Sequence, residues 1–468
     1  MGHETGHVRA TLVLTEELAA DIRSKAALPL ETAGVLLGSV VRTPEGDLRL
    51  LGRKMRWISE SAYIRRGPDH MGIASGGYVP FLSEAETLGA AALWVHTHPG
   101  EHAEPTPSSH DREVDFQIAD LFRLRSGNSC YGTLIVSPRP AGMAFTGYLE
   151  FDNAARIPFT RLWEVGGRFR LHHPFAFDPD EVSLDFDRNI RAFGGAVQTA
   201  LGDLRVGIVG CGGTGSAVAE QLARLGVRRM VLIDPDELSS SNVTRVYGST
   251  PADVGQPKVD VIAGHLKRIT PNMHVDALRS TINLEGTALR LTSSDVVFGC
   301  TDDNAGRLVL SRFASYLLTP VIDCGVLLSS DESGSLLGID GRVTTLVPGQ
   351  ACLVCRNRID LQRAATELLT PEERVRLQNE GYAPALGRVE PAVITFTSLV
   401  AASAVSELLE RLIGYGPNPQ PSEVLLRCHD REISTNRASP RDGHYCDSAA
   451  EKRGLGVTIP FLEQTWPA

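Results

Sequence analysis

The segment Arg205–Asp236, which reads RVGIVGCGGTGSAVAEQLARLGVRRMVLIDPD, decides the fold of the larger part of the chain. An apolar run at Val206–Val209 predicts a strand, and a glycine-rich turn follows at Gly210–Gly215. A helical pattern then leads to a second apolar run, Met230–Ile233, which ends at an acidic residue. A strand, a tight turn, a helix and a strand in this order are typical of a nucleotide-binding sheet. We therefore expect a Rossmann-like α/β domain with a mostly parallel sheet.

The chemistry of phosphate binding explains the residue types in this turn. Glycines allow the backbone to approach a phosphate closely, and the N-terminus of the following helix attracts the anion. An acidic residue at the end of the second strand can accept hydrogen bonds from ribose hydroxyl groups. The residues that we expect to bind the nucleotide here are Gly210, Gly212, Gly213, Gly215 and Asp234.

Further motifs downstream distinguish one nucleotide-binding family from another. They are, in order, Asp234-Pro235-Asp236, Asn242-Val243-Thr244-Arg245, Lys258, and Thr301-Asp302 with Arg307 behind it. This set resembles the ATP site of ubiquitin-activating enzymes and of their bacterial relatives ThiF and MoeB. The resemblance covers about residues 185–447, and it implies ATP-dependent adenylation of the C-terminal glycine of a ubiquitin-like protein. A plain dehydrogenase, the alternative, would not need this set.

The resemblance also assigns roles within the ATP site. Asn242, Arg245 and Lys258 would hold the phosphates and neutralise the charge at the α-phosphorus while a carboxylate attacks. Asp234 and Asp236 would bind the nucleotide on the ribose side. Mg²⁺ prefers carboxylate and phosphate oxygens, and the spacing to Arg307 favours Asp302 as its ligand over the adjacent Asp303.

A segment before the glycine loop carries a further resemblance. Residues 183–200 are predicted to form a helix, and it contains Phe186-Asp187-Arg188-Asn189. In the activating family an arginine from the equivalent segment reaches the ATP phosphates of the partner subunit. The resemblance therefore implies a homodimer in which Arg188 has this role, with Arg191 as the second choice. A solvent-exposed helix face is the alternative interpretation.

A second site is indicated near the N-terminus, where a predicted strand at Ala91–Val95 ends in His96-Thr97-His98. Side chains two residues apart on a strand point to the same face, so both imidazoles lie together. Asp111 follows at the start of a helical pattern. Two imidazoles and a carboxylate suit a tetrahedral zinc with an open fourth position. Zinc acidifies water, and a nearby carboxylate must then move the proton; Glu31 is the candidate.

These residues resemble the JAMM (JAB/MPN) metalloprotease family, in which a glutamate precedes a His-x-His pair, a serine and an aspartate. The resemblance covers roughly residues 8–150 and implies an MPN-type α/β domain. It also implies three zinc ligands, a general base, and a serine that holds the water or the developing oxyanion. In this sequence these residues are His96, His98 and Asp111 for the zinc, Glu31 for the base, and Ser108 for the serine.

The spacing departs from the family pattern at one point. The gap from His98 to Asp111 is longer than usual, so His102 and His110 compete as zinc ligands. A histidine pair that is merely hydrogen-bonded at a strand end is the alternative for an isolated His-x-His motif. The presence of Glu31 and of the downstream serine and aspartate, all in order, favours the zinc site.

A third group of residues is formed by cysteines. Relatives of the activating family often hold a structural zinc between a Cys-x-x-Cys pair and a second pair near the end of the domain. Here Cys352 and Cys355 form the first pair, but the second pair is incomplete because Cys446 stands alone. Either His444 or Cys428 would supply the fourth ligand, and a pair without metal is the alternative. The chain has no cysteine between positions 355 and 428, so we expect no thioester in the segment that crosses over the active site.

Composition limits the class of protein. The chain has 468 residues with 42% apolar content, a formal net charge of −10, and no long basic run, which argues against nucleic acid or an anionic membrane as the partner. It contains neither an apolar run of membrane-spanning length nor a signal-peptide core, and its eight cysteines fit a reducing cytoplasm. We expect a peptidase domain at 8–150, a linker at 151–182, an adenylation domain at 183–447 and a tail at 448–468.

The sequence therefore predicts a bifunctional enzyme of a bacterial ubiquitin-like modification pathway that uses Zn²⁺, ATP and Mg²⁺. One domain would activate a ubiquitin-like protein, and the other would cleave that protein from a precursor or a target. A conjugating-enzyme homologue is the expected partner. The alternative is activation of a ubiquitin-like sulfur carrier for thiocarboxylate formation, with a sulfurtransferase as the partner. A scaffold with inactive sites is a third interpretation, which the completeness of the motifs disfavours.

Overall fold

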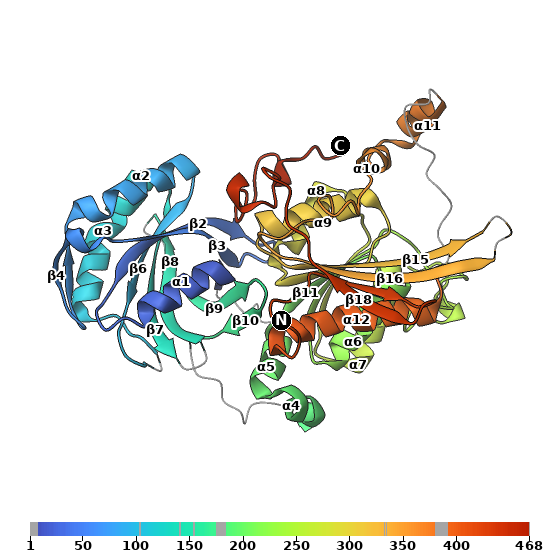
Figure 1. Cartoon of the computed structure of the whole chain (residues 1–468), viewed down its shortest axis with the longest axis horizontal. Coiled ribbons are helices and arrows are strands. Elements are labelled where there is room, and N and C mark those ends of the chain that lie inside the picture. The colour runs from blue at the N-terminus through green and yellow to red at the C-terminus, as the bar shows by residue number, and fades with distance from the viewer. Residues whose placement is uncertain are drawn as a thin grey trace, which may run out of the picture. The chain divides into compact units, whose positions relative to one another are not determined.

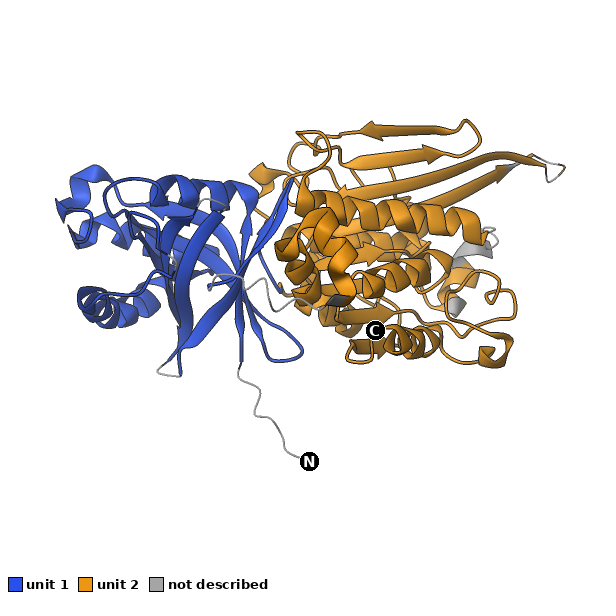
Figure 2. Ribbon diagram, turned by 90° about the horizontal axis from the view of Figure 1, so that it is seen from below, with its two compact units in different colours: residues 1–178, 454–457 blue, residues 179–453, 458–468 orange. Residues whose placement is uncertain are grey.

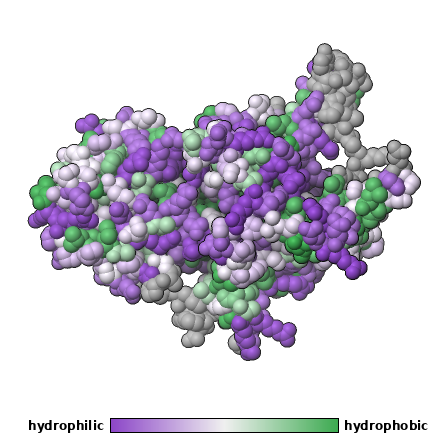
Figure 3. Space-filling model, in the orientation of Figure 1, coloured by the Kyte–Doolittle hydropathy of each residue, from purple (hydrophilic) through white to green (hydrophobic). Residues whose placement is uncertain are grey.

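The computed structural model divides into two compact units, which Figures 1 and 2 show. The first unit contains residues 1–178 and 454–457, and the second contains residues 179–453 and 458–468. The structure describes residues 8–102, 104–139, 142–152, 155–174, 184–331, 333, 335–379 and 392–467. No helix within these ranges combines the length and the apolar character needed to cross a membrane. The face of the molecule in Figure 3 is mostly hydrophilic, with apolar residues in small separate groups.

An eight-stranded sheet forms the frame of the first unit, in the order β1-β3-β2-β6-β7-β8-β9-β10. The strands are β1 (Ala10–Thr15), β2 (Ala33–Arg42), β3 (Leu48–Trp57), β6 (Ala91–Thr97), β7 (Cys130–Arg139), β8 (Gly142–Phe151), β9 (Ile157–Val165) and β10 (Phe169–His172). Because β1 pairs with both β3 and β9, the sheet closes on itself. A separate ribbon pairs β4 (Tyr63–Arg66) with β5 (Met71–Ile73).

Successive side chains along each strand point to opposite faces of the sheet, so this unit has two apolar cores. Leu93 and Val95 of β6 belong to one core, whereas Ala92 and Trp94 belong to the other. Helix α1 (Glu16–Ala26) packs in the first core, and α2 (Val79–Leu88) and α3 (Ser109–Ser126) cover the second. Thr15 caps α1, because its Oγ1 accepts a hydrogen bond from the Leu18 amide. The cores hold the strand ends that carry the site in fixed positions.

The predicted linker at 151–182 is wrong over much of its length, because β9 and β10 lie within it and complete the first sheet. The polar residues that suggested a connector surround a buried carboxylate instead. Glu164 is fully buried and accepts bonds from Arg23 at 2.6 Å and Arg170 at 2.5 Å. Burial raises the pKa of Glu164, but hydrogen bonds from His172 and Arg23 outweigh it and lower the pKa to about 2.

The second unit contains another eight-stranded sheet, in the order β13-β12-β11-β14-β15-β16-β17-β18. Its first five strands are parallel, and β16, β17 and β18 extend it in antiparallel fashion. The strands are β11 (Arg205–Val209), β12 (Arg229–Ile233), β13 (His274–Leu278), β14 (Val296–Gly299), β15 (Val321–Ser330), β16 (Leu336–Leu346), β17 (Glu423–Arg427) and β18 (Glu432–Asn436). The parallel part has the Rossmann-like arrangement that the glycine-rich turn predicts.

Helices cover this sheet on both faces (Figure 1). They are α4 (Asp187–Phe193), α5 (Gly195–Asp203), α6 (Gly213–Arg224), α7 (Lys258–Ile269), α8 (Glu285–Arg290), α9 (Asn304–Tyr316), α10 (Leu361–Glu367), α11 (Pro371–Asn379) and α12 (Ile394–Ile413). The long helix α12 lies on one face of the antiparallel part, because a Cβ at Gly341 would meet Val400 of that helix. Arg342 and Thr344 of β16 therefore point to the opposite face.

Two further expectations about the second unit need correction. The single helix predicted at 183–200 is broken into α4 and α5 at Gly194, whose φ is +87°. The predicted tail at 448–468 is not a loose end, since Phe461 is fully buried and Arg312 donates to the carbonyl oxygen of Leu462 at 2.7 Å. The crossover region after residue 379 falls largely at 380–391, outside the described residues.

Candidate functional sites

The structure brings His96, His98 and Asp111 together in the first unit. His96 is the last residue but one of β6, and His98 follows the end of that strand. Asp111 lies in the first turn of α3. The Nε2 atom of His96 is 3.4 Å from Oδ1 of Asp111, and Nε2 of His98 is 3.5 Å from Oδ2 of the same carboxylate. The three side chains each offer one ligand atom within 4.8 Å of the others.

These atoms are spaced as a tetrahedral zinc requires. Zinc–nitrogen and zinc–oxygen bonds of about 2.0 Å place neighbouring ligand atoms about 3.3 Å apart. His96 is 3% exposed, and its Nε2 has no hydrogen-bond partner. A buried imidazole nitrogen without a partner is costly unless a ligand satisfies it. The residues therefore fit a zinc ion.

The electrostatics of the cluster separate its two carboxylates. Burial raises the pKa of Asp111, but the adjacent imidazoles of His96 and His98 outweigh it and hold that pKa well below its usual value. Glu31 precedes β2, and its Oε1 is 4.0 Å from Nε2 of His98. Burial, with a smaller contribution from the charge of Asp111, raises the pKa of Glu31 to about 7. One carboxylate suits a ligand, and the other suits a group that exchanges protons.

The competing residues near this cluster have other contacts. Ser108 caps α3: its Oγ accepts from the Asp111 amide at 3.1 Å, and its own amide donates to Oδ2 of Asp111 at 2.7 Å. This capping box fixes the orientation of the Asp111 carboxylate and leaves the Ser108 hydroxyl hydrogen free to donate. His102 approaches the carbonyl oxygen of Pro99 at 3.1 Å, and neither it nor His110 joins the three-residue cluster.

A cavity of about 400 Å³ adjoins the cluster, a feature that sequence reasoning missed. Its lining includes His96 and Asp111 at one side and Trp94, Ile135 and Tyr148 on the sheet. Asp115 forms part of the wall and is neutralised by hydrogen bonds from two tyrosines and an ion pair with Arg156. The cluster therefore opens onto a space large enough for substrate side chains.

In the second unit, the glycine-rich turn has the geometry of a phosphate loop. Gly210 has a φ of +90°, and a Cβ at Gly215 would lie only 1.8 Å from the carbonyl oxygen of Gly210. Helix α6 begins at Gly213 without a side-chain cap, and a Cβ at Gly212 would meet nothing within 4 Å. The uncapped amides and the open approach fit a nucleotide phosphate.

The two acids after β12 differ in role. Asp234 is 5% exposed, and its carboxylate accepts from the amides of Cys211 at 2.7 Å and Asp236 at 2.9 Å. Burial raises the pKa of Asp234, and Lys258 opposes that shift. This carboxylate holds the loop in place through two of its lone pairs. The exposed carboxylate of Asp236 lies 2.6 Å from Nζ of Lys258 and remains open to a ligand.

Hydrogen bonding also distinguishes the two adjacent acids after β14, Asp302 and Asp303. Asp303 caps α9, accepting from the Gly306 amide at 2.7 Å and from Asn283 at 2.8 Å. Asp302 is exposed, and no hydrogen bond from another described residue is seen at its carboxylate. An exposed carboxylate with free oxygens fits a Mg²⁺ ligand, whereas a capping carboxylate does not. Asp302 stays the predicted Mg²⁺ ligand.

The remaining residues of the expected ATP site lie in two segments: Asn242 and Arg245 lie between β12 and α7, and Arg188 lies on α4. Asn242 is 9% exposed, and its Oδ1 accepts from the Ser239 amide at 3.0 Å. Arg245 lies one turn later and donates to the carbonyl oxygen of Ser241 at 3.1 Å. Arg188 is exposed on α4, and the neighbouring Arg191 is tied to Asp187 by an ion pair of 3.0 Å. Arg188 is therefore the freer of the two candidate arginines.

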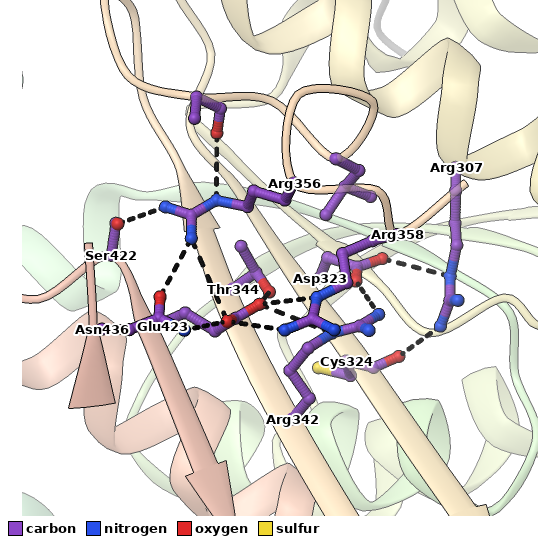
Figure 4. A network of polar contacts seen from close by, with 12 residues as sticks. Arg307, Asp323, Cys324, Arg342, Thr344, Arg356, Arg358, Ser422, Glu423 and Asn436 are labelled. Atoms are coloured by element: carbon purple, nitrogen blue, oxygen red, sulfur yellow. Dashed lines mark hydrogen bonds and ion pairs between the residues drawn. The ribbon is translucent and has the colours of Figure 1, made fainter. Parts of the chain in front are cut away.

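A network of arginines and acids lies on the face of β15–β17 opposite α12 (Figure 4). Asp323, 1% exposed, faces Arg307 at 3.4 Å and Arg342 at 3.2 Å. Glu423, also 1% exposed, accepts two hydrogen bonds from Arg358 at 3.2 and 2.9 Å. Only Arg307 belongs to a motif, and the others carry no sequence signal that could have identified them.

The cysteine cluster is complete in the structure. Cys352, Cys355, His444 and Cys446 each offer one ligand atom within 4.8 Å of the others, and Cys428 is not part of this group. The distances that join the sulfur atoms and the His444 Nδ1 run from 3.3 to 3.6 Å. Zinc bonds of ~2.3 Å to sulfur and ~2.0 Å to nitrogen place such atoms about 3.5–3.8 Å apart. The donor set fits a closed, structural zinc with His444 as the fourth ligand.

Four of the five cysteines outside the cluster are buried or have a raised pKa, which disfavours them as nucleophiles. Burial raises the pKa of Cys211 well above its usual value, and the Cys324 thiol, followed by burial, does the same for Cys300. Cys324 is buried within β15, and Cys130 is buried in the first unit, where its pKa is raised to about 12 by burial. The absence of a thioester stays a prediction.

Comparison with known proteins identifies the second unit. The ThiF family model matches residues 186–447, more than half of the chain. The chain belongs to the ThiF family. The molybdopterin-synthase adenylyltransferase of Escherichia coli K12 is 29% identical over 266 residues, which cover 55% of this chain and 94% of that protein.

Two other relatives extend the comparison. The sulfur carrier protein ThiS adenylyltransferase of E. coli K12 is 32% identical over 160 residues, covering 34% of this chain and 60% of that protein. Ubiquitin-like modifier-activating enzyme 5 of Oryza sativa subsp. japonica is 27% identical over 228 residues, covering 46% of this chain and 49% of that protein. The second unit is thus similar both to adenylyltransferases, one of them named for a sulfur carrier protein, and to a ubiquitin-like modifier-activating enzyme.

The cysteine cluster yields a prediction about metal content. Cys446→Ser should lower bound zinc by about one ion per chain and reduce the melting temperature by several degrees, because a structural zinc contributes directly to folding stability. Cys428→Ser, in the same unit but outside the cluster, should do neither. Metal analysis and calorimetry measure both quantities. An unchanged zinc content in Cys446→Ser would show that the cluster binds no metal.

Proposed function

We propose that the chain is a bifunctional enzyme that activates and cleaves a ubiquitin-like protein. Its second unit adenylates the C-terminal glycine of that protein with ATP and Mg²⁺. Its first unit is a JAMM-type, MPN-like zinc peptidase that removes the same protein from a precursor or a target. We place both activities in the cytoplasm, since the eight free cysteines suit a reducing compartment.

Adenylation is supported above all by one observation: the open phosphate loop lies in a unit that matches the ThiF family. Asp236, rather than Asp234, would bind the ribose because its carboxylate is exposed beside Lys258. Lys258 and Arg245, with Asn242 ordering their loop, would hold the phosphates and offset the charge that develops during attack. Asp302 would hold Mg²⁺, which neutralises phosphate oxygens when bound.

Peptidase activity is supported by the convergence of His96, His98 and Asp111 beside a buried glutamate. A zinc ion held by the three side chains would supply Lewis-acid chemistry. Glu31 would accept a proton from the attacking water and return it to the leaving amine, a role that suits a carboxylate of raised pKa. The Ser108 hydroxyl would donate to the oxygen of the scissile carbonyl, and the adjacent cavity would hold substrate.

Two pathways share this chemistry. In a modification pathway, a conjugating-enzyme homologue would receive the activated protein, and the absence of an exposed cysteine nucleophile favours direct transfer. In sulfur metabolism, a sulfurtransferase would convert the activated glycine into a thiocarboxylate, which the name of one relative, the sulfur carrier protein ThiS adenylyltransferase, favours. Incubation with candidate ubiquitin-like proteins and ATP, followed by intact-mass measurement, separates an adduct from a thiocarboxylate.

The peptidase assignment predicts a separation of metal binding from catalysis. Glu31→Ala should lower the cleavage rate by about 10²–10⁴-fold while zinc stays bound, because Glu31 moves protons and is not a ligand. His96→Ala should lose both the metal and the activity. Asp120→Ala, which removes an exposed carboxylate of the same unit, serves as the control. Cleavage by Glu31→Ala at the wild-type rate would reject Glu31 as the base.

The adenylation assignment predicts different effects for the two adjacent acids. Asp302→Ala should abolish Mg²⁺-dependent pyrophosphate exchange and leave peptide cleavage unchanged, because the sites lie in separate units. Asp303→Ala should retain exchange but lose about 1 kcal/mol of stability, since it removes a helix cap. Exchange assays and denaturant unfolding test the pair. The reverse pattern of activities would assign the metal to Asp303.

Arg188 provides a test of the proposed homodimer. If this arginine acts across the dimer, Arg188→Ala and Asp302→Ala proteins should each be inactive in exchange, yet a mixture should regain activity, because one of the two sites in a mixed dimer is intact. The mixture is measured after subunit exchange, with each variant alone as the control. If the two variants form heterodimers but the mixture stays inactive, Arg188 does not act on the ATP site of the partner subunit. It would then act in its own subunit's site or outside the site.

A further inference from the structure

Two guanidinium groups converge beside Gly325 in the second unit. Gly325 of β15 pairs in register with Arg342 of β16, so the arginine side chain lies next to a position that has no side chain. A Cβ at Gly325 would be 3.3 Å from Nη2 of Arg342 and also 3.3 Å from Nη2 of Arg307. Two like charges thus meet at one point of the sheet, and a glycine leaves that point without a side chain.

Most of the hydrogen-bonding capacity of these groups is unused. A guanidinium has five N–H donors. Arg342 donates one hydrogen bond, to Asp323, and Arg307 donates one, to the carbonyl oxygen of Cys324. The Nε atom of Arg307 forms an ion pair with Asp323 at 3.4 Å and that of Arg342 forms one with Glu423 at 3.9 Å, but neither Nε makes a hydrogen bond. The two side chains keep 15% and 18% of their surface exposed, so their remaining N–H donors favour an added acceptor.

The charges of the network point to an acceptor that is anionic. Four arginines, Arg307, Arg342, Arg356 and Arg358, surround only two carboxylates, those of Asp323 and Glu423. Zinc with three thiolates would add one negative charge next to Arg356, and this still leaves an excess of positive charge. Burying such an excess is unfavourable unless an anion accompanies it.

Arg356 shows what a purely structural arginine looks like in the same network. Its guanidinium bonds to the Ala351 carbonyl oxygen, to Asn436 and to Ser422, and its side chain is 3% exposed. Arg307 and Arg342 lack such a set of partners. The contrast separates an arginine that ties strands together from two that present donors to a ligand.

We propose that Arg307 and Arg342, with Arg358 at the edge, form a receptor for the carboxylate at the C-terminus of the polypeptide substrate. This inference rests on the proposed adenylation, whose substrate must bring a carboxylate to ATP. The location agrees, because Asp323 pairs in register with Gly299, the last residue of β14, and Asp302 follows three residues later. Paired guanidinium donors match the geometry of a carboxylate better than a single cation would.

Equilibrium binding of a fluorescent probe tests the receptor without ATP or turnover. The probe is an N-terminally labelled decapeptide that ends in Gly-Gly, made once with a free carboxylate and once with a C-terminal amide. The full-length wild-type chain should bind the carboxylate form at least about tenfold more tightly, because a charge-assisted bond is lost in the amide. Equal binding of the two forms, or no binding of the carboxylate form at about 1 mM, rejects the receptor.

Two variants act on the site in different ways. Arg342→Lys keeps the charge but removes the paired donors, and Gly325→Ala keeps both arginines but presses against their Nη2 atoms. Each should bring the carboxylate preference close to one. Arg427→Met removes an exposed arginine of β17, and Gly286→Ala adds a methyl group where nothing lies within 4 Å; both should retain the preference. A preference that survives Arg342→Lys and Gly325→Ala overturns the proposal.

A nucleotide phosphate is the other source of anionic oxygens near this site. ATP·Mg²⁺ binding, measured on the same variants, should be unchanged by Gly325→Ala. Weaker ATP binding with an intact carboxylate preference would assign the arginines to the nucleotide instead. Asp302→Ala separates this inference from the proposed function, because it should lose pyrophosphate exchange and keep the carboxylate preference. If the wild-type chain shows no pyrophosphate exchange but still prefers the carboxylate peptide, the proposed adenylation is refuted and the carboxylate receptor is not.

Discussion

One close approach between two parts of the backbone governs the second unit. A Cβ at Gly215 would lie 1.8 Å from the carbonyl oxygen of Gly210, and Gly210 itself has a φ of +90°. Only glycine at both positions lets β11 turn directly into α6. The buried carboxylate of Asp234 then holds the turn through the Cys211 amide, so the uncapped start of α6 stays available for an anion.

In the first unit, a side chain rather than a glycine turn orders the start of a helix. Helix α3 also starts after a strand and a loop, but here a capping box closes its N-terminus, and the carboxylate in that box is Asp111. One Asp111 oxygen accepts from the Ser108 amide while the carboxylate faces both histidines. The same residue therefore orders the helix and lines up a ligand, and any replacement would disturb both functions together.

Local sequence signals predicted most of this architecture, and long-range charge pairing explains what they missed. The glycine loop, the His-x-His strand end and the Thr15 cap are encoded by neighbouring residues. By contrast, β9 lies in the segment that was predicted as a linker, and its Glu164 is buried because Arg23, more than a hundred residues earlier, pairs with it. Likewise, nothing near Arg342 indicates that Gly325 will lie opposite it, because that pairing depends on strand register.

The cysteine cluster and the arginine network are joined by the chain itself. Cys355 precedes Arg356, and Asn357 then takes a left-handed conformation with a φ of +54°, so Arg358 turns back toward Glu423. A zinc that fixes Cys355 against Cys446 would fix the start of this turn as well. The zinc ligands that stabilise the fold would thereby hold Arg358 against Glu423. Arg358 lies at the edge of the surface where the C-terminus of the substrate would bind. A structural metal far from the phosphates would in this way influence substrate recognition without touching the substrate.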